Sequence, residues 1–303
     1  MINRTMGPAE WAMLVFLGIV WGGSFFFYAV AVKALPTFTI VFLRVSLGSM
    51  GLWLAVWATG LLSFRRPGLW RNFLIMGLIN NAIPFSLIAW GQREVASGLA
   101  AILNAATPFF TVLAANMLTA DEKLSWNRMA GAVIGLTGVA AMMGADIPGT
   151  QEGSLLSQLA IVGASVSYAF ASVFGRRFAT IPPLIIAAGQ TAGSSLILLP
   201  VMLVIDMPWR LSSPSVDIWL AIAGLAVLCT SLAYILYFTI LKRAGATNIV
   251  LVTFLVPASA ILLGIVFLGE TLGIHHVVGM ATIAAGLALI DGRLLTFLKP
   301  RRA

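Results

Sequence analysis

Residues 122–138, EKLSWNRMAGAVIGLTG, and residues 270–286, ETLGIHHVVGMATIAAG, share one spacing of a glutamate and two glycines, E-x8-G-x6-G. A proline precedes each segment, Pro108 by fourteen residues and Pro257 by thirteen. Similarity at a fixed offset is the signature of an internal repeat. The two segments therefore predict a chain built from two related halves.

The same offset, close to 149 residues, aligns further positions outside these segments. The aligned positions are Asn80-Asn81 with Cys229-Thr230, Phe85 with Tyr234, Arg93 with Lys242 and, at an offset of 147, Trp21 with Tyr168. Because the surrounding hydropathy matches as well, we predict a first repeat over residues 1–146 and a second over residues 147–303. The two repeats are expected to form one compact membrane domain.

The composition predicts an integral membrane protein. Of 303 residues, 60% are hydrophobic and only 9% charged, and the mean hydropathy is +1.01. A soluble domain is usually about 25% charged, so lipid must be the solvent for most of this surface. The net charge of +8 is carried by loops and chain ends, where it orients helices rather than binding nucleic acid.

Clusters of charge, glycine and proline divide the chain into apolar runs, each long enough for a transmembrane helix of roughly 20 residues. Strands are a poor alternative, because the runs are long and lack the alternation of a membrane barrel. We predict ten transmembrane helices, at residues 9–32, 38–59, 69–90, 98–118, 126–143, 154–175, 183–205, 215–240, 247–268 and 275–292.

Lysine and arginine predict the orientation of these helices, because they are enriched in cytoplasmic connections. One set of connections holds fourteen of the eighteen basic residues, and the other set holds only Lys33, Arg93 and Arg210. Both termini are therefore expected in the cytoplasm. Since each half has five spans, an odd number, the second half must be inverted relative to the first. Inverted repeats are a recurrent basis for alternating access in carriers.

Four stretches carry a family resemblance: WGGSFF at 21–26, FLRVSLG at 42–48, and the proline-to-glycine runs at 108–138 and 257–286. Through their order and duplication, the chain resembles the EamA family of the drug/metabolite transporter superfamily. The resemblance implies a ten-helix bundle around a central cavity, lined by the first four helices of each half. The fifth and tenth helices are expected at the periphery. Within the family the chain is most similar to amino-acid exporters of the YddG type.

Arg44 is the only charged residue well inside a predicted span. An ionisable side chain in the membrane interior is costly and suggests a functional site. One interpretation is that Arg44 binds a substrate carboxylate. The other is that it snorkels to the outer headgroups or bonds backbone carbonyls.

Other polar and aromatic side chains inside the spans are candidates for the cavity wall. Asn80 and Asn81, near Pro84, could bind substrate or cap an irregular backbone, and hydroxyls such as Thr230 can bond their own helix. Tryptophan and tyrosine at mid-membrane need polar partners away from lipid. The predicted substrate-binding residues are Trp21, Tyr28, Arg44, Asn80, Asn81, Trp90, Asn104, Thr107, Tyr168, Gln190, Ser231, Tyr234 and Tyr237.

Charged and histidine residues at the span ends are assigned structural roles. Glu122 and Glu270 are expected to be caps or interfacial anchors. His275 and His276 are neighbours in sequence, which should point to different sides of a helix, so no metal site is expected there. No cofactor, catalytic residue or nucleic-acid partner is predicted.

The preferred function is export of neutral or aromatic amino acids and related metabolites by alternating access, in a bacterial inner membrane. Because no carboxylate falls in the middle of a span, transport is expected to follow the solute gradient without proton coupling. The alternatives are a proton-coupled efflux carrier for drugs and organic cations, a membrane-embedded enzyme, and a structural protein. The oligomeric state, monomer or homodimer, stays open.

Overall fold

The computed structural model describes residues 6–63, 68–119, 125–143, 153–249 and 251–291. Every regular element in these ranges is a helix, and none is a strand. The expectation of an all-helical chain is therefore confirmed for the described residues. The predicted boundary between residues 146 and 147 and the residue Glu122 lie outside them.

The first half of the chain forms helices over the first five predicted ranges. Two of these ranges contain an interruption: a π-helical segment separates α3 from α4, and a short break separates α5 from α6. The elements are α1 (Pro8–Ala31), α2 (Thr37–Ala58), η1 (Leu61–Ser63), α3 (Leu69–Gly77), η2 (Leu78–Ala82), α4 (Ile83–Gly91), α5 (Ser97–Asn104), α6 (Thr107–Leu118) and α7 (Trp126–Met142).

The second half follows the same order, with helices over the other five predicted ranges. Its counterpart of the α3–α4 span is again interrupted by a π-helical segment. The elements are α8 (Leu155–Gly175), η3 (Arg176–Phe178), α9 (Pro183–Val201), η4 (Met202–Asp206), η5 (Pro208–Arg210), α10 (Val216–Ala223), η6 (Gly224–Leu232), α11 (Ala233–Ala244), α12 (Ala246–Ile249), α13 (Val252–Leu263), η7 (Gly264–Leu268) and α14 (Ile274–Asp291).

Most of the long helical segments have the length and hydropathy that a membrane span requires. Among the described residues, seven helical segments have the length and hydropathy of a membrane span, and two further apolar segments, Val252–Leu268 and Ile274–Ile290, are shorter. Large apolar side chains also remain exposed on the perimeter, such as Met50 (68%) and Leu196 (58%). Exposed apolar surface on this scale suits lipid rather than water.

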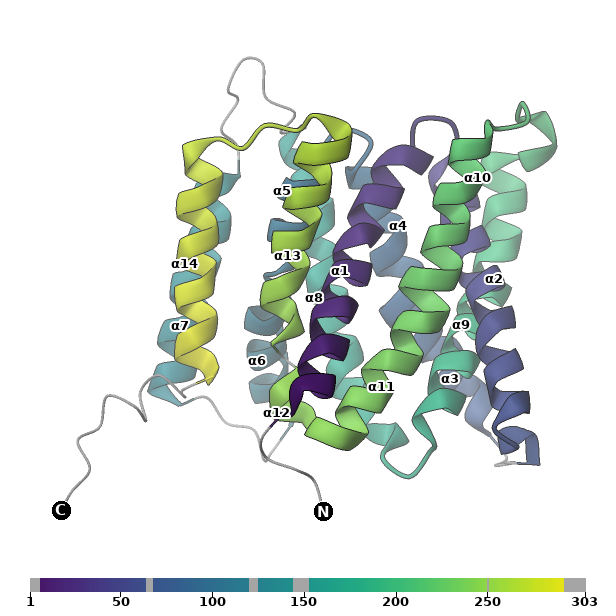
Figure 1. Cartoon of the computed structure of the whole chain (residues 1–303), viewed down its shortest axis with the longest axis horizontal. Helices are drawn as coiled ribbons and strands as arrows, with labels where there is room; N and C mark the ends of the chain where they lie inside the picture. The colour runs from purple at the N-terminus through teal and green to yellow at the C-terminus, as the bar shows by residue number, and fades with distance from the viewer. Residues whose placement is uncertain (1–5, 64–67, 120–124, 144–152, 250, 292–303) are drawn as a thin grey trace.

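The two halves interlock. The first helix of each half packs on later helices of the other half: α1 contacts α13 and α11, and α8 contacts α6 and α4. The second helices, α2 and α9, also pack on each other. Figure 1 shows α3 below α4 but α10 above α11, so these corresponding spans run in opposite directions. In the same view α1 begins and α14 ends at the lower end of the bundle.

Helices α7 and α14 form a separate pair at one edge of the bundle (Figure 1). Their glycines are in close contact, as the repeated spacing suggests. A Cβ built on Gly131 would lie 2.6 Å from the carbonyl oxygen of Gly286, and a Cβ on Gly286 would lie 2.6 Å from that of Gly131. Gly138 and Gly279 make a second reciprocal contact, at 3.1 and 3.2 Å. Small residues are required here because the two backbones touch.

The π-helical segments η2 and η6 occupy aligned positions of the two halves. Pro84, at the start of α4, has no N–H to donate to the preceding turn. The Ser167 hydroxyl supplies the missing bond, donating to the carbonyl oxygen of Ile79 at 2.6 Å. π-Helical segments are rare in proteins, and those that occur are often found at functional sites. They expose Asn80 and Asn81 on η2, and Thr230 on η6, to neighbouring helices.

Candidate functional site

Arg44 is a buried cation held by hydroxyl groups. Its side chain is 5% exposed. The Nε atom donates to Thr230 Oγ1 at 3.1 Å, and one terminal nitrogen donates to Tyr28 Oη at 2.9 Å and Ser24 Oγ at 3.0 Å. The guanidinium carbon also lies 3.8 Å from the centre of the Phe85 ring. We call these five residues the arginine cluster. The interpretation that Arg44 snorkels or bonds backbone carbonyls is therefore wrong, because helices from both halves enclose the side chain.

Arg44 has no acidic partner among the residues that the structure describes. Within the described part of the chain it forms no ion pair, and the groups that accept its hydrogen bonds are neutral hydroxyls. A buried charge without a counter-ion carries a large desolvation cost. Close approach of α2 to η6 maintains this arrangement, since a Cβ on Gly48 would lie 2.7 Å from Thr230 Cγ2. An anionic group beside Arg44 would compensate this charge.

A second group of polar side chains, which we call the amide cluster, joins three spans. Asn80 Nδ2 donates to Gln190 Oε1 at 3.1 Å and lies 3.4 Å from Tyr234 Oη. Asn81 Nδ2 donates to Ser194 Oγ at 3.4 Å, and Tyr234 Oη donates to Asn81 Oδ1 at 3.3 Å. Both asparagines thus bond side chains of the second half. The alternative that they cap the irregular backbone is not seen in these hydrogen bonds.

The two clusters form one continuous polar region. Asn81 at the end of η2 and Phe85 in α4 are one helical turn apart, and so are Thr230 in η6 and Tyr234 in α11. The two side chains of each pair therefore share a helix face. Each pair joins one member of the amide cluster to one member of the arginine cluster. Tyr168 packs against the same hydrophobic core cluster as Tyr28 and Phe85.

Trp21 and Tyr237 form a neighbouring aromatic pair. Their ring centroids are 5.5 Å apart and their planes are inclined by 36°. Trp21 is half-buried, as expected for a side chain that lies away from lipid. The pair joins α1, in the first half of the chain, to α11, in the second half.

Four of the predicted residues belong neither to the two clusters nor to their aromatic neighbours: Trp90, Asn104, Thr107 and Ser231. The Thr107 hydroxyl donates to the carbonyl oxygen of Asn104 at 2.8 Å, which Pro108 leaves without its helical donor. The Ser231 hydroxyl donates to the carbonyl oxygen of Gly48 at 2.9 Å and holds α2 against η6. Trp90 is the last residue but one of α4 and lines a cavity apart from the two clusters.

Ser24, Phe85, Thr230 and Ser194 complete the two clusters and were absent from the predicted set. The expectation that Thr230 bonds its own helix is confirmed, since its hydroxyl donates to the carbonyl oxygen of Leu225 at 2.8 Å, but the same oxygen also accepts from Arg44. Two sequence signals were available. Ser24 lies one turn before Tyr28, and Thr230 aligns with Asn81 in the repeat.

Carboxylates at the upper end of the bundle cap helices that belong to the other half. Glu270 accepts hydrogen bonds from the backbone N–H groups of Ser97, at 2.6 Å, and Gly98, at 3.0 Å, at the start of α5. Its predicted role as a cap is thereby confirmed. Asp206 accepts from the backbone N–H of Thr39 at 2.6 Å and from its hydroxyl at 2.9 Å, in the first turn of α2.

Glu94 caps α8 in the same manner. It accepts from the backbone N–H of Ser154 at 3.1 Å, from its hydroxyl at 2.5 Å, and from the Ser157 hydroxyl at 2.7 Å. These hydrogen bonds favour the charged carboxylate and lower the pKa of Glu94 below its ordinary value. Glu270, Asp206 and Glu94 therefore serve as helix caps.

The two histidines lie together, contrary to the expectation that they point apart. Their Nε2 atoms are 3.1 Å from each other, and the backbone N–H of Gly273 donates to His276 Nδ1 at 3.1 Å. In the first turn of α14 the side chains can fold back toward each other. No group of three or more metal-ligating side chains occurs among the described residues.

Comparison with known proteins gives one consistent assignment. The model of the EamA-like transporter family matches residues 9–144 and again residues 155–291. The chain is 26% identical to the inner membrane transporter YedA of Escherichia coli, over 94% of this chain and 91% of that protein. It is 22% identical to the transporter YoaV of Bacillus subtilis (90% and 94% covered) and 26% identical to the protein PecM of Dickeya dadantii (90% and 89%). A crystal structure has the same fold, with a TM-score of 0.68 at 21% identity over 99% of this chain and 100% of that one.

Proposed function

Because the chain belongs to the EamA-like transporter family, whose relatives bear the names of membrane transporters rather than enzymes, we propose that it carries amino acids across a bacterial inner membrane. Neutral amino acids with an apolar or aromatic side chain are the proposed cargo, and export is the proposed direction. A relative named as an inner membrane transporter supports the location.

The proposed architecture has ten transmembrane helices in two inverted repeats, residues 1–146 and 147–303, with both termini in the cytoplasm. The family model matches twice along the chain, and corresponding spans run in opposite directions in Figure 1. The reciprocal glycine contacts of α7 and α14 have the two-fold relation that such repeats require. Exchange of conformation between the halves would then open the central site to either face.

The observation that carries the proposed cargo is the buried Arg44, for which the described residues provide no acidic partner. A substrate carboxylate would supply the missing negative charge and accept strong, charge-assisted hydrogen bonds. The rings of Phe85 and Tyr28, which already lie over the guanidinium, offer an apolar wall. The side-chain oxygens of the amide cluster, such as Asn81 Oδ1 and Tyr234 Oη, can accept hydrogen bonds from an ammonium group.

The same residue makes organic cations the weaker candidate. A cation in this site would meet the positive charge of Arg44, and the repulsion between two buried charges is strong. Carriers of organic cations favour an acidic group or an aromatic cage without a competing cation. The aromatic residues near Arg44 therefore serve an amino acid better than a quaternary amine.

Transport without proton coupling is supported by the position of the acids. Glu94, Asp206 and Glu270 lie at helix ends and accept hydrogen bonds from helix N-termini. A coupling carboxylate usually lies within the membrane, where it can exchange its proton. Net flux would then follow the amino-acid gradient, which an amino-acid-producing cell directs outward.

Ligand-dependent thermal stability in detergent tests the proposal. Purified protein is heated with each member of a panel of amino acids, their decarboxylated amines and unrelated sugars. We expect stabilisation by apolar and aromatic amino acids and little by the amines, since ligands that bind the folded state raise its melting temperature. A flat response to the whole panel would contradict a small-solute carrier.

Proteoliposomes with and without a pH gradient test the coupling. We expect amino-acid uptake to reach the same final level in both. Accumulation of the amino acid above its external concentration, dependent on the proton gradient, would overturn uncoupled transport and leave the cargo assignment intact.

A further inference from the structure

A lateral cavity lies between η2 and α4 on one side and α9 and η4 on the other. It is separate from the arginine and amide clusters. Its volume is about 540 Å³, within the range of roughly 300–1,000 Å³ typical of small-molecule sites. α3 and η2 pack on α9, but α4 packs on α8 instead. α9 therefore separates from α4 in this region, and residues at the start of α2 also line the cavity.

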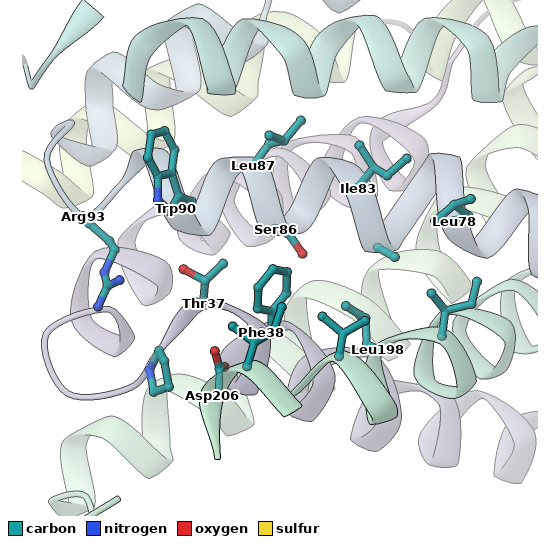
Figure 2. Close-up of a pocket in the computed structure, with 15 residues that line it drawn as sticks. Thr37, Phe38, Leu78, Ile83, Ser86, Leu87, Trp90, Arg93, Leu198 and Asp206 are labelled. Atoms are coloured by element: carbon teal, nitrogen blue, oxygen red, sulfur yellow. The ribbon is translucent and has the colours of Figure 1, made fainter. Parts of the chain in front are cut away.

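The cavity is amphipathic along its length. Figure 2 shows Arg93, Trp90, Thr37 and Asp206 toward one end, whereas Leu78 lies at the other, with aliphatic side chains between them. An apolar body is thus expected in one half of the cavity and a polar head in the other.

The polar end has unused bonding capacity for both signs of charge. Asp206 accepts its hydrogen bonds from Thr39 through one carboxylate oxygen only, Oδ2. Arg93 is exposed and forms no ion pair within the described part of the chain. The hydroxyls of Thr37, a residue only 7% exposed, and of Ser86 are buried without a hydrogen-bond partner. Buried polar groups of this kind need an explanation, and a bound polar headgroup would satisfy them.

The apolar end borders the lipid-facing surface. Ile83 is 38% exposed and Leu78 37%, and both line the cavity. A ligand can therefore reach the cavity sideways from the bilayer, with its chain along the aliphatic wall. A free amino acid would leave most of that wall empty.

We propose that this cavity binds a phospholipid whose headgroup carries both a phosphate and a primary ammonium group, such as phosphatidylethanolamine. The phosphate would lie at Arg93 and the buried hydroxyls, the ammonium at the free oxygen of Asp206, and one acyl chain along the aliphatic wall. Because Asp206 also caps α2, the bound lipid would bridge the third span to the junction of the second and seventh spans. The proposal rests on membrane insertion of the bundle and is independent of its cargo.

Native mass spectrometry of the delipidated full chain, titrated with phosphatidylethanolamine, tests the proposal. Phosphatidylglycerol with the same acyl chains lacks the ammonium group and serves as the comparison lipid. Ser86→Phe fills the cavity and loses only an unpartnered hydroxyl, and Arg93→Gln removes the phosphate partner from an exposed position. The matched controls are Val133→Phe, on the lipid-facing side of α7, and Arg210→Gln, an exposed arginine at the same end of the bundle.

The wild type and both controls should bind phosphatidylethanolamine more tightly than phosphatidylglycerol. Each cavity variant should bind phosphatidylethanolamine about tenfold more weakly, Arg93→Gln because it loses one charge-assisted contact and Ser86→Phe because its ring occupies space that the lipid needs. Equal affinity for the two lipids in the wild type, or wild-type affinity in Arg93→Gln, would overturn the proposal. So would an amino acid whose stabilising effect is lost in Ser86→Phe while lipid binding is unchanged, since the cavity would then belong to the transported solute.

Discussion

Replacement of Arg44 by methionine separates a substrate-binding role of the guanidinium from a purely structural one. Methionine keeps an unbranched side chain of similar length but has neither charge nor hydrogen-bond donor. The variant therefore lacks the three hydrogen bonds that the guanidinium donates to the hydroxyls of Ser24, Tyr28 and Thr230. If the site binds carboxylates, the variant also loses the charge that attracts them.

The magnitude of the effect follows from the contacts. A hydrogen bond to a charged group contributes about 1.5–3 kcal/mol, so loss of the guanidinium should weaken amino-acid binding by roughly 10- to 150-fold. Protein stability should change much less. The three hydrogen bonds between the charged guanidinium and the hydroxyls contribute about 1.5–3 kcal/mol each, and removal of a buried charge without a counter-ion offsets much of that loss.

The assay measures the affinities of phenylalanine and of phenethylamine, the same molecule without its carboxylate. Wild type should bind the amino acid far more tightly than the amine. Arg44→Met should lose that preference, and its affinity for the amine should stay the same or rise. Arg210→Met, at an exposed arginine, should behave as wild type. Equal weakening of both ligands by Arg44→Met would refute a direct contact between Arg44 and the carboxylate.

Three further substitutions probe neighbouring features. Tyr234→Phe removes the hydroxyl that joins the two asparagines and should slow amino-acid transport several-fold in proteoliposomes, whereas Tyr237→Phe, whose hydroxyl has no hydrogen-bond partner among the described residues, should not. Gly77→Ala places a Cβ 2.5 Å from a carbonyl oxygen of α9 and should destabilise the protein by about 1–3 kcal/mol. The control Gly163→Ala, whose Cβ would lie 3.6 Å from its nearest neighbour, should leave the stability unchanged. Equal melting temperatures of the two variants would refute the close contact at Gly77. Hydrogen bonds lower the pKa of Glu94 in the folded protein. Its stabilising effect is therefore present above the ordinary carboxyl pKa of about 4.3 and is lost as the pH falls through the lower pKa of the folded state. Glu94→Gln should flatten this part of the curve of melting temperature against pH, and an unchanged curve would contradict the cap.

The sequence predicted the positions of the helices well, because hydropathy over about 20 residues is a strong local signal. It did not predict the π-helical segments. The irregular turn at Asn80 depends on the Ser167 hydroxyl, which bonds a carbonyl 88 residues away in the chain. Such a partner is set by packing between spans and leaves no mark on local hydropathy.

The candidate site was predicted residue by residue but not as an arrangement. Arg44, Asn81 and Tyr234 were identified because polar groups are costly in the membrane. The burial of Arg44 depends on Thr230, 186 residues further along the chain, which brings the second half over the arginine. The caps formed by Glu94 and Asp206 are equally long-range, at separations of 60 and 167 residues, so the local sequence does not indicate them.

The most direct test of the central claim is counterflow in proteoliposomes loaded with an unlabelled apolar amino acid and diluted into a trace of the labelled one. A carrier exchanges the two, so we predict transient accumulation of label inside the vesicles that contain wild-type protein, without any ion gradient. Arg44→Met vesicles should show little accumulation, and protein-free vesicles none. Absence of counterflow for every amino acid tested, with correctly inserted wild-type protein, would contradict the account.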